Sequence, residues 1–107
     1  MKPSTDREAV TLIIKGLIER GVIPVSVEDG EREDFPFDHE NMDSSIDELM
    51  SCDEGWLNVT IPASLTGDKD TDTWIYFVYG NDPEEVACDY GVSLSPYLDP
   101  IIEPWWE

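Results

Sequence analysis

The fold of this 107-residue chain is decided by two stretches, WLNVTI at residues 56–61 and WIYFVY at residues 74–79. In the first stretch, Leu57, Val59 and Ile61 share one face of an extended chain and alternate with more polar residues, as in a strand with one buried face. The second stretch is apolar or aromatic on both faces, which is typical of a strand in the middle of a sheet. A polar loop joins the two, so we expect them to pair as an antiparallel hairpin.

Residues 5–21 predict a helix upstream of this hairpin. Thr5 and Glu8 have the spacing of a capping box, in which each satisfies an otherwise unpaired backbone N–H at the start of a helix. The apolar residues between Val10 and Ile18 recur at helical spacing, so one face of the helix is expected to be buried. Gly21 can then adopt the left-handed conformation that ends a helix.

A short strand is expected next, between Val22 and Val27. Its residues Ile23, Val25 and Val27 alternate, which assigns them to one face of the sheet. Pro24 has no N–H to donate to a neighbouring strand, and this favours a position at the edge of the sheet or at the start of a strand.

An acidic connection without clear periodicity, residues 28–43, follows that strand. Ser44 or Ser45 can cap a short helix after it, because a serine hydroxyl accepts a hydrogen bond from a free N–H of the first turn. In such a helix the apolar residues Ile46 and Leu49 face inward, and the acidic residues between them face water.

A second short helix is expected from Asp82, which can cap it, with Val86 and Tyr90 facing inward. The rest of the chain is expected to be irregular, because three prolines in the tail, residues 95–107, exclude a long helix. The whole chain, residues 1–107, is then one α+β domain: a small antiparallel sheet of about three strands with two or three helices packed on one face.

Charge is the strongest signal in the composition, with 25 Asp and Glu against 6 Lys and Arg and a net charge of −19. Such a charge repels nucleic acids and anionic membrane surfaces, which argues against direct binding to either. No apolar run is long enough to span a bilayer and no secretory signal is evident, so we expect a cytoplasmic protein. The expected macromolecular partner is a basic protein.

Sequence motifs of enzymes and of metal sites are not evident. His39 is the only histidine and is interpreted as a solvated loop residue. Cys52 and Cys88 are interpreted as reduced, buried thiols, with a disulfide as the alternative. The acidic run at residues 68–72 resembles the first half of a calcium loop but lacks the glycine and the glutamate that complete it, which leaves only weak cation binding open. We therefore expect no enzyme activity, no metal site and no cofactor.

A net charge of −19 exceeds what solubility requires, which is roughly 2–8 for a small domain. Adaptation to high salt and weak storage of cations are two alternative explanations. The third, which we favour, is mimicry of nucleic acid: ordered carboxylates occupy the basic cleft of a nucleic-acid-binding protein and inhibit it by competition. The candidate partner-binding residues are Glu31, Glu33, Asp34, Asp38, Glu40, Asp43, Asp47 and Glu48.

Trp105 and Trp106, at the end of the chain, offer an alternative interaction site. If they are exposed, they form an apolar and aromatic patch through which an accessory protein could bind and regulate a partner, because tryptophan is enriched at binding hot spots. If they fold back, they are expected to cover the second face of the sheet, where Trp56, Trp74 and Tyr76 are also expected. Binding through charge should weaken steeply as salt rises, whereas an apolar contact should not.

Several segments together resemble a group of small acidic proteins encoded by phages and prophages. They are the first helix running into VSVEDGE at residues 25–31, IDELMSCDE at residues 46–54, and VYGNDPEEV at residues 78–86. The chain departs from the group in its Pro- and Trp-rich tail and in its longer acidic connection. The resemblance implies a mobile-element origin and an α+β fold, with no established activity. It also favours mimicry, because small acidic phage proteins often inhibit DNA-binding host defences such as restriction or CRISPR.

Overall fold

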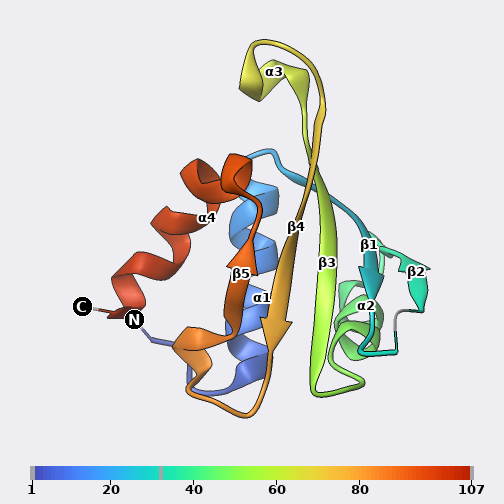
Figure 1. Ribbon diagram of the computed structural model, residues 1–107, viewed down its shortest axis with the longest axis vertical. Coiled ribbons are helices and arrows are strands. Elements are labelled where there is room, and N and C mark those ends of the chain that lie inside the picture. The colour runs from blue at the N-terminus through green and yellow to red at the C-terminus, as the bar shows by residue number, and fades with distance from the viewer. Residues whose placement is uncertain (1, 32, 107) are drawn as a thin grey trace.

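The computed structural model describes residues 2–31 and 33–106, and its centre is an antiparallel sheet with strand order β2-β1-β3-β4-β5. The strands are β1 (Ile23–Glu28), β2 (Asp34–Pro36), β3 (Glu54–Ile61), β4 (Thr71–Val78) and β5 (Ala87–Tyr90). The helices are α1 (Asp6–Glu19), α2 (Met42–Leu49), α3 (Ala63–Thr66) and α4 (Ser95–Ile102), with 3-10 turns η1 (Pro83–Glu85), η2 (Val92–Leu94) and η3 (Glu103–Trp106). None of the described helices is long and apolar enough to cross a membrane. Figure 1 shows α1 and α2 behind the sheet and α4 beside α1, so the expected α+β class is confirmed, with additional strands at both edges.

β3 and β4 form the expected antiparallel hairpin at the centre of the sheet. Trp56 pairs with Tyr76, and Asn58 pairs with Trp74. Alternate residues of the two strands are buried on the helix side: Leu57, Val59, Ile61, Ile75 and Phe77. The connecting loop contains α3, which ends at Gly67 in the left-handed conformation, with φ of 77°. The side of the hairpin away from the helices carries aromatic residues in partial contact with solvent.

α1 begins and ends as its sequence predicts. The N–H of Glu8 donates to the hydroxyl of Thr5 at 3.0 Å, and Gly21 follows the helix with φ of 89°. In the last turn of α1, the absence of a side chain at Gly16 lets α4 approach closely, because a Cβ there would lie 2.7 Å from Cδ1 of Ile101. This contact seats the C-terminal segment against α1.

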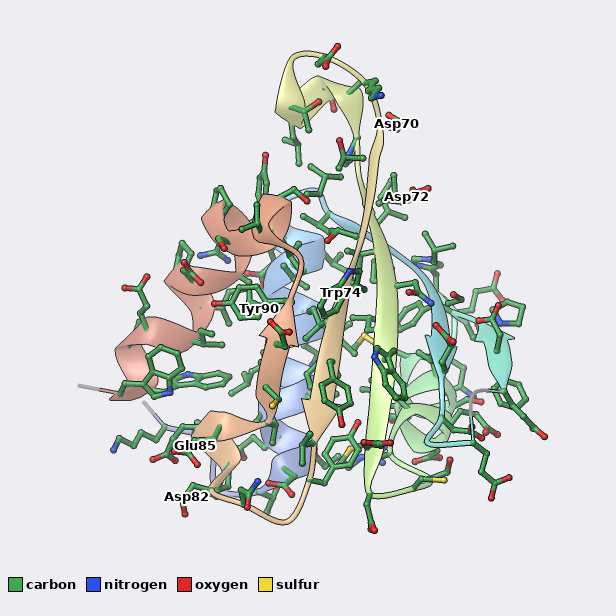
Figure 2. The ribbon with its side chains drawn as sticks, viewed as in Figure 1. Asp70, Asp72, Trp74, Asp82, Glu85 and Tyr90 are labelled. Atoms are coloured by element: carbon green, nitrogen blue, oxygen red, sulfur yellow. The ribbon has the colours of Figure 1, made fainter. Side chains whose placement is uncertain are left out.

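The prediction of a short helix from Asp82 is wrong. Asp82 precedes only the single turn η1, its side chain makes no capping hydrogen bond, and the chain then continues as β5. Figure 2 shows Asp82 and Glu85 at the turn that leads into this strand. Tyr90 pairs with Ile75 of β4, so the backbone here is hydrogen-bonded to a neighbouring strand, which a single helical turn does not provide. Val86 is buried, as expected.

The prediction of an irregular C-terminal tail, made from its prolines, is wrong, because most of the tail is helical. Pro96 stands in the first turn of α4, where a missing N–H removes no hydrogen bond, and Pro100 lies inside the helix. Leu98 and Ile102 are fully buried, and this burial offsets the hydrogen bond that the internal proline removes.

The hydroxyl of Tyr90 donates to Asp99 at 2.6 Å and links α4 to the edge strand β5. This hydrogen bond, with desolvation, raises the pKa of Tyr90 to about 12.

The register of β1 differs from the sequence prediction. Val27 is buried, but Ile23 and Val25 are exposed, so the three do not share a face. The reason is a shift in the pairing of β1 with β3 between Pro24 and Ser26, which turns Pro24 inward in place of Val25.

α2 begins earlier than predicted, and neither serine caps it. The side chain of Asn41 accepts the capping hydrogen bond, from the N–H of Ser44 at 3.3 Å. Ser45 is instead buried, and its hydroxyl accepts the N–H of Asp38 at 2.7 Å. The hydroxyl of Tyr79 donates to the carbonyl of Leu49 at 3.0 Å and holds the end of α2 on the sheet, and burial there raises the pKa of Tyr79.

Candidate functional site

The acidic residues that the sequence singles out lie on four consecutive segments: the turn between β1 and β2, β2 itself, the connection from β2 to α2, and α2. We call them the acidic surface: Glu31, Glu33, Asp34, Asp38, Glu40, Asp43, Asp47 and Glu48. All are exposed except Glu48, which is half-buried. Because α2 contacts both β1 and β2, these elements form one continuous part of the molecule.

The backbone beneath the acidic surface is ordered by two aspartates. Asp29 is buried, and its Oδ1 accepts the N–H of Glu31 at 2.9 Å and the N–H of Glu33 at 3.1 Å. Asp29 therefore acts as a turn residue, whose side chain accepts hydrogen bonds from the backbone that follows it. Asp38 does the same in the following connection, where its Oδ1 accepts the N–H groups of Glu40 and Asn41, both at 3.0 Å. Asp38 is therefore partly a structural residue.

Arg7 joins the acidic surface to α1. Its guanidinium lies 2.6 Å from the carboxylate of Asp47 and 3.7 Å from that of Asp43, and it also donates to the carbonyl of Asp43 at 3.3 Å. Among the cations that the structure describes, Arg7 is the one that forms ion pairs with the acidic surface. Asp43 and Asp47 are thus partly neutralised, while the rest of the acidic surface keeps its charge.

A second candidate surface is the side of the sheet that the helices leave uncovered, which sequence reasoning did not propose as a binding site. The rings of Trp56 and Tyr76 stack there, with centroids 4.8 Å apart and planes at 24°. Trp74 lies beside them and is 38% exposed. We call Trp56, Trp74 and Tyr76 the aromatic face. The alternation in both strands placed these three side chains on the second face, but nothing in the sequence showed that the described helices would leave that face uncovered.

Two carboxylates next to the aromatic face are held by neutral donors. The hydroxyl of Tyr76 donates to Glu54, and this hydrogen bond, with desolvation, raises the pKa of Tyr76. The hydroxyl of Thr60 donates to Asp72 at 2.7 Å. Figure 2 shows Asp72 and Trp74 along the same strand.

Two shallow hollows flank Trp74. One has a volume of about 330 Å³ and includes Val25, Thr60 and Asp72 in its lining. The other has a volume of about 260 Å³, and its lining includes Trp56. Asn58 and Trp74 line both hollows, so they form a shared wall between them.

The structure separates the two tryptophans of the alternative site. Trp105 is 4% exposed and belongs to the hydrophobic core, so it is not available to a partner. Trp106 is 56% exposed, and its indole N–H donates to the carbonyl of Glu84 at 2.9 Å. The expectation that a folded-back tail covers the second face of the sheet is wrong, because the tail continues from α4, which packs on α1.

The other polar residues noted in the sequence have local contacts. His39 is exposed, as expected for a loop histidine, with Nε2 2.9 Å from the carbonyl of Pro24. Cys52 and Cys88 are free thiols, and the expectation of burial is wrong, since Cys52 is half-buried and Cys88 is exposed. In the acidic hairpin run, Asp70 accepts the backbone N–H of Ala63 at 2.8 Å.

The acidic surface presents negative charge, and the aromatic face presents partly exposed rings. In the described part of the chain, no group of three or more His, Cys, Asp or Glu side chains is arranged to hold a metal ion. Their chemistry suits the recognition of a cationic partner, through long-range attraction to carboxylates and contact with aromatic rings. No protein-family model, curated protein or solved structure matches the chain.

Proposed function

We propose that the chain is a non-enzymatic protein that binds a basic, nucleic-acid-binding protein as a mimic of DNA or RNA. Acting in the cytoplasm of a host cell, it inhibits a defence of the restriction or CRISPR type. The observation that carries the proposal is the acidic surface: its side chains are exposed, and the backbone beneath them is ordered by Asp29 and Asp38. The resemblance to phage-encoded proteins supports the same conclusion.

Order in the backbone matters because a mimic has to present its charges before it binds. Duplex DNA carries about one negative charge per 1.7 Å of its axis, and proteins that bind it line their clefts with lysine and arginine. Carboxylates on a folded scaffold can enter such a cleft without the entropy loss of assembling the pattern at the moment of binding. The net charge of −19 adds long-range attraction, which speeds the encounter with a basic protein.

The proposal is tested by capturing partners from host lysate with the tagged protein, eluting with a salt gradient and identifying the eluate by mass spectrometry. One nucleic-acid-binding protein, released by moderate salt and displaced by added DNA, supports mimicry. A single partner that resists salt contradicts it and favours an accessory role through an apolar surface. Absence of any stoichiometric partner at low salt also contradicts it and leaves adaptation to high salt as the explanation of the charge.

Variants in which acidic side chains are replaced by their neutral amides locate the binding surface. The test variant combines Glu31→Gln, Glu33→Gln, Asp34→Asn and Glu40→Gln, which avoid the acids that order the backbone or pair with Arg7. The control combines Glu19→Gln, Asp68→Asn, Glu85→Gln and Glu103→Gln, which are exposed on other elements and give the same net charge. We expect the test variant to bind the captured protein about 100-fold more weakly, and the control less than about tenfold. Equal losses would mean that net charge, and not this surface, determines binding.

A further inference from the structure

We propose that the aromatic face binds arginine side chains of a partner protein. The face combines stacked rings at Trp56 and Tyr76 with the partly exposed indole of Trp74, all on the side of the sheet that no described helix covers. Tryptophan and tyrosine faces attract cations, and Trp is the strongest of the aromatic side chains in this respect. The proposal goes beyond nucleic-acid mimicry, since it holds for any partner that presents arginine.

The carboxylates around the face give it the charge that a cation requires. Asp72 and Glu54 are held by the hydroxyls of Thr60 and Tyr76, which are neutral donors. A neutral donor fixes the position of a carboxylate without cancelling its charge. None of the salt bridges between described residues involves Asp72 or Glu54. Both therefore present fixed negative charge to a partner.

The lining of the face favours a cation that can contact an aromatic ring and a carboxylate at the same time. The hollow of about 330 Å³ has both Trp74 and Asp72 in its lining, so a single side chain that enters it lies next to both residues. A guanidinium group is planar, so it can stack on an indole while its N–H groups donate to a carboxylate in the plane of the group. The ammonium of lysine is a compact point charge and has no flat face to stack. Arginine is accordingly the preferred occupant.

The surrounding charge separates this face from a platform for nucleic-acid bases. Exposed aromatic residues on a sheet also stack against single-stranded bases in RNA- and DNA-binding domains, but those domains surround the rings with basic residues that bind phosphate. Here Asp72 and Glu54 flank the rings, and the whole chain has a charge of −19. Phosphate is repelled from such a face and guanidinium is attracted to it.

The test uses two peptides of equal charge, hexa-arginine and hexa-lysine, titrated into the folded protein at about 0.15 M NaCl. Binding is followed by calorimetry and by the indole N–H signals of Trp74 and Trp106 in NMR spectra. The variants are Trp74→Leu with Trp106→Leu as its control, and Asp72→Asn with Asp68→Asn as its control. Each pair removes one exposed indole or one exposed carboxylate, so the members are matched in composition and charge.

We expect hexa-arginine to bind more tightly than hexa-lysine and to move the Trp74 signal but not the Trp106 signal. Trp74→Leu should weaken hexa-arginine binding about tenfold and hexa-lysine binding less than twofold, and Trp106→Leu should change neither. Asp72→Asn should weaken hexa-arginine binding about threefold more than Asp68→Asn does. Equal affinity for the two peptides, or equal behaviour of the variants within each pair, would overturn the proposal.

Failure of this inference and failure of the mimicry proposal give different results. If the variant of Glu31, Glu33, Asp34 and Glu40 loses the captured partner but keeps Trp74-dependent binding of hexa-arginine, the two surfaces act separately and both proposals stand. If a nucleic-acid-binding partner is captured but the binding of hexa-arginine does not depend on Trp74, only the arginine site is refuted. If no such partner exists and the peptide still selects Trp74, only mimicry is refuted.

Discussion

The guanidinium of Arg7 on α1 lies 2.6 Å from the carboxylate of Asp47 on α2, and the same side chain donates to the carbonyl of Asp43. This cation joins two helices that are far apart in sequence, and it contacts the α2 part of the acidic surface. Arg7→Ala should lower the free energy of unfolding by about 1 kcal/mol, since an exposed ion pair contributes less than that alone and the carbonyl contact adds to it. Lys15→Ala removes an exposed cation from the same helix and is the matched control.

A double-mutant cycle with Asp47→Asn isolates the Arg7–Asp47 pair by urea unfolding. We expect a coupling energy of roughly 0.5 kcal/mol that shrinks in high salt. A coupling near zero at low salt would show that the acidic helix is positioned without Arg7.

The two neighbouring tryptophans at the end of the chain should differ sharply in their effect on stability. Trp105 is in the core, so Trp105→Ala should lower the free energy of unfolding by about 3–5 kcal/mol, through lost burial and the cavity left behind. Trp106 is mostly exposed, and Trp106→Ala should cost less than about 1 kcal/mol. Urea midpoints of the two variants check this. Similar losses would contradict the packing of the tail, and Trp105→Phe serves as a milder variant if Trp105→Ala does not fold.

The hydrogen bond from Tyr90 to Asp99 should make stability depend on pH in the alkaline range. The folded state holds the phenol proton more tightly, because the pKa of Tyr90 rises from 10.0 to about 12. Its stabilising effect is therefore complete below pH 10 and is lost as the pH rises from 10 towards 12. Tyr90→Phe should cost about 1 kcal/mol at neutral pH and should flatten the fall in stability over that window. Thermal unfolding of both proteins at several alkaline pH values measures this, and parallel curves would refute the role of Tyr90.

Gly55 is the point at which β3 passes the end of α2. A Cβ there would clash with the carbonyl of Leu49 and would lie 3.2 Å from the carbonyl of Glu28, both of them backbone atoms that cannot rotate away. Gly55→Ala should therefore destabilise the protein by at least about 2 kcal/mol. Gly67→Ala is the control, because Gly67 has a left-handed φ but no atom near its Cβ position, and it should cost about 1 kcal/mol from backbone strain alone. Urea unfolding of both variants ranks them, and a larger loss at Gly67 would contradict the close packing at Gly55.

The central hairpin and α1 could be predicted from the sequence because their signals are local. Alternation in residues 56–61 and capping at Thr5 operate within a few residues of the chain. β2 could not be predicted, because its three residues are too few to show a period. β5 was missed because the residues before it begin a helical turn, whereas the residues of β5 itself are stabilised by pairing with β4. The shift between Pro24 and Ser26 depends on how β1 meets β3, which the sequence of β1 alone does not contain.

The candidate sites were predictable to a similar extent. Counting charges located the acidic surface, and the structure shows its residues exposed, but counting could not show that Arg7 neutralises part of it from another helix. Alternation placed Trp74 on the second face of the sheet, while its exposure depends on where the tail goes. The burial of Trp105 could not be predicted from the sequence, because it depends on α4. The prolines in that segment argued against a helix there.

The pairing of β1 with β3 also has a consequence for folding kinetics. These strands meet only after the chain has closed the segment at residues 29–53, which carries ten acidic residues and one basic residue. Closing any such loop costs entropy, and here mutual repulsion of the carboxylates adds to the barrier. Refolding should therefore accelerate as salt is added, with little change in the unfolding rate. The charge that we propose attracts a basic partner is thus also expected to slow folding, and a cationic partner present during folding should lower that barrier.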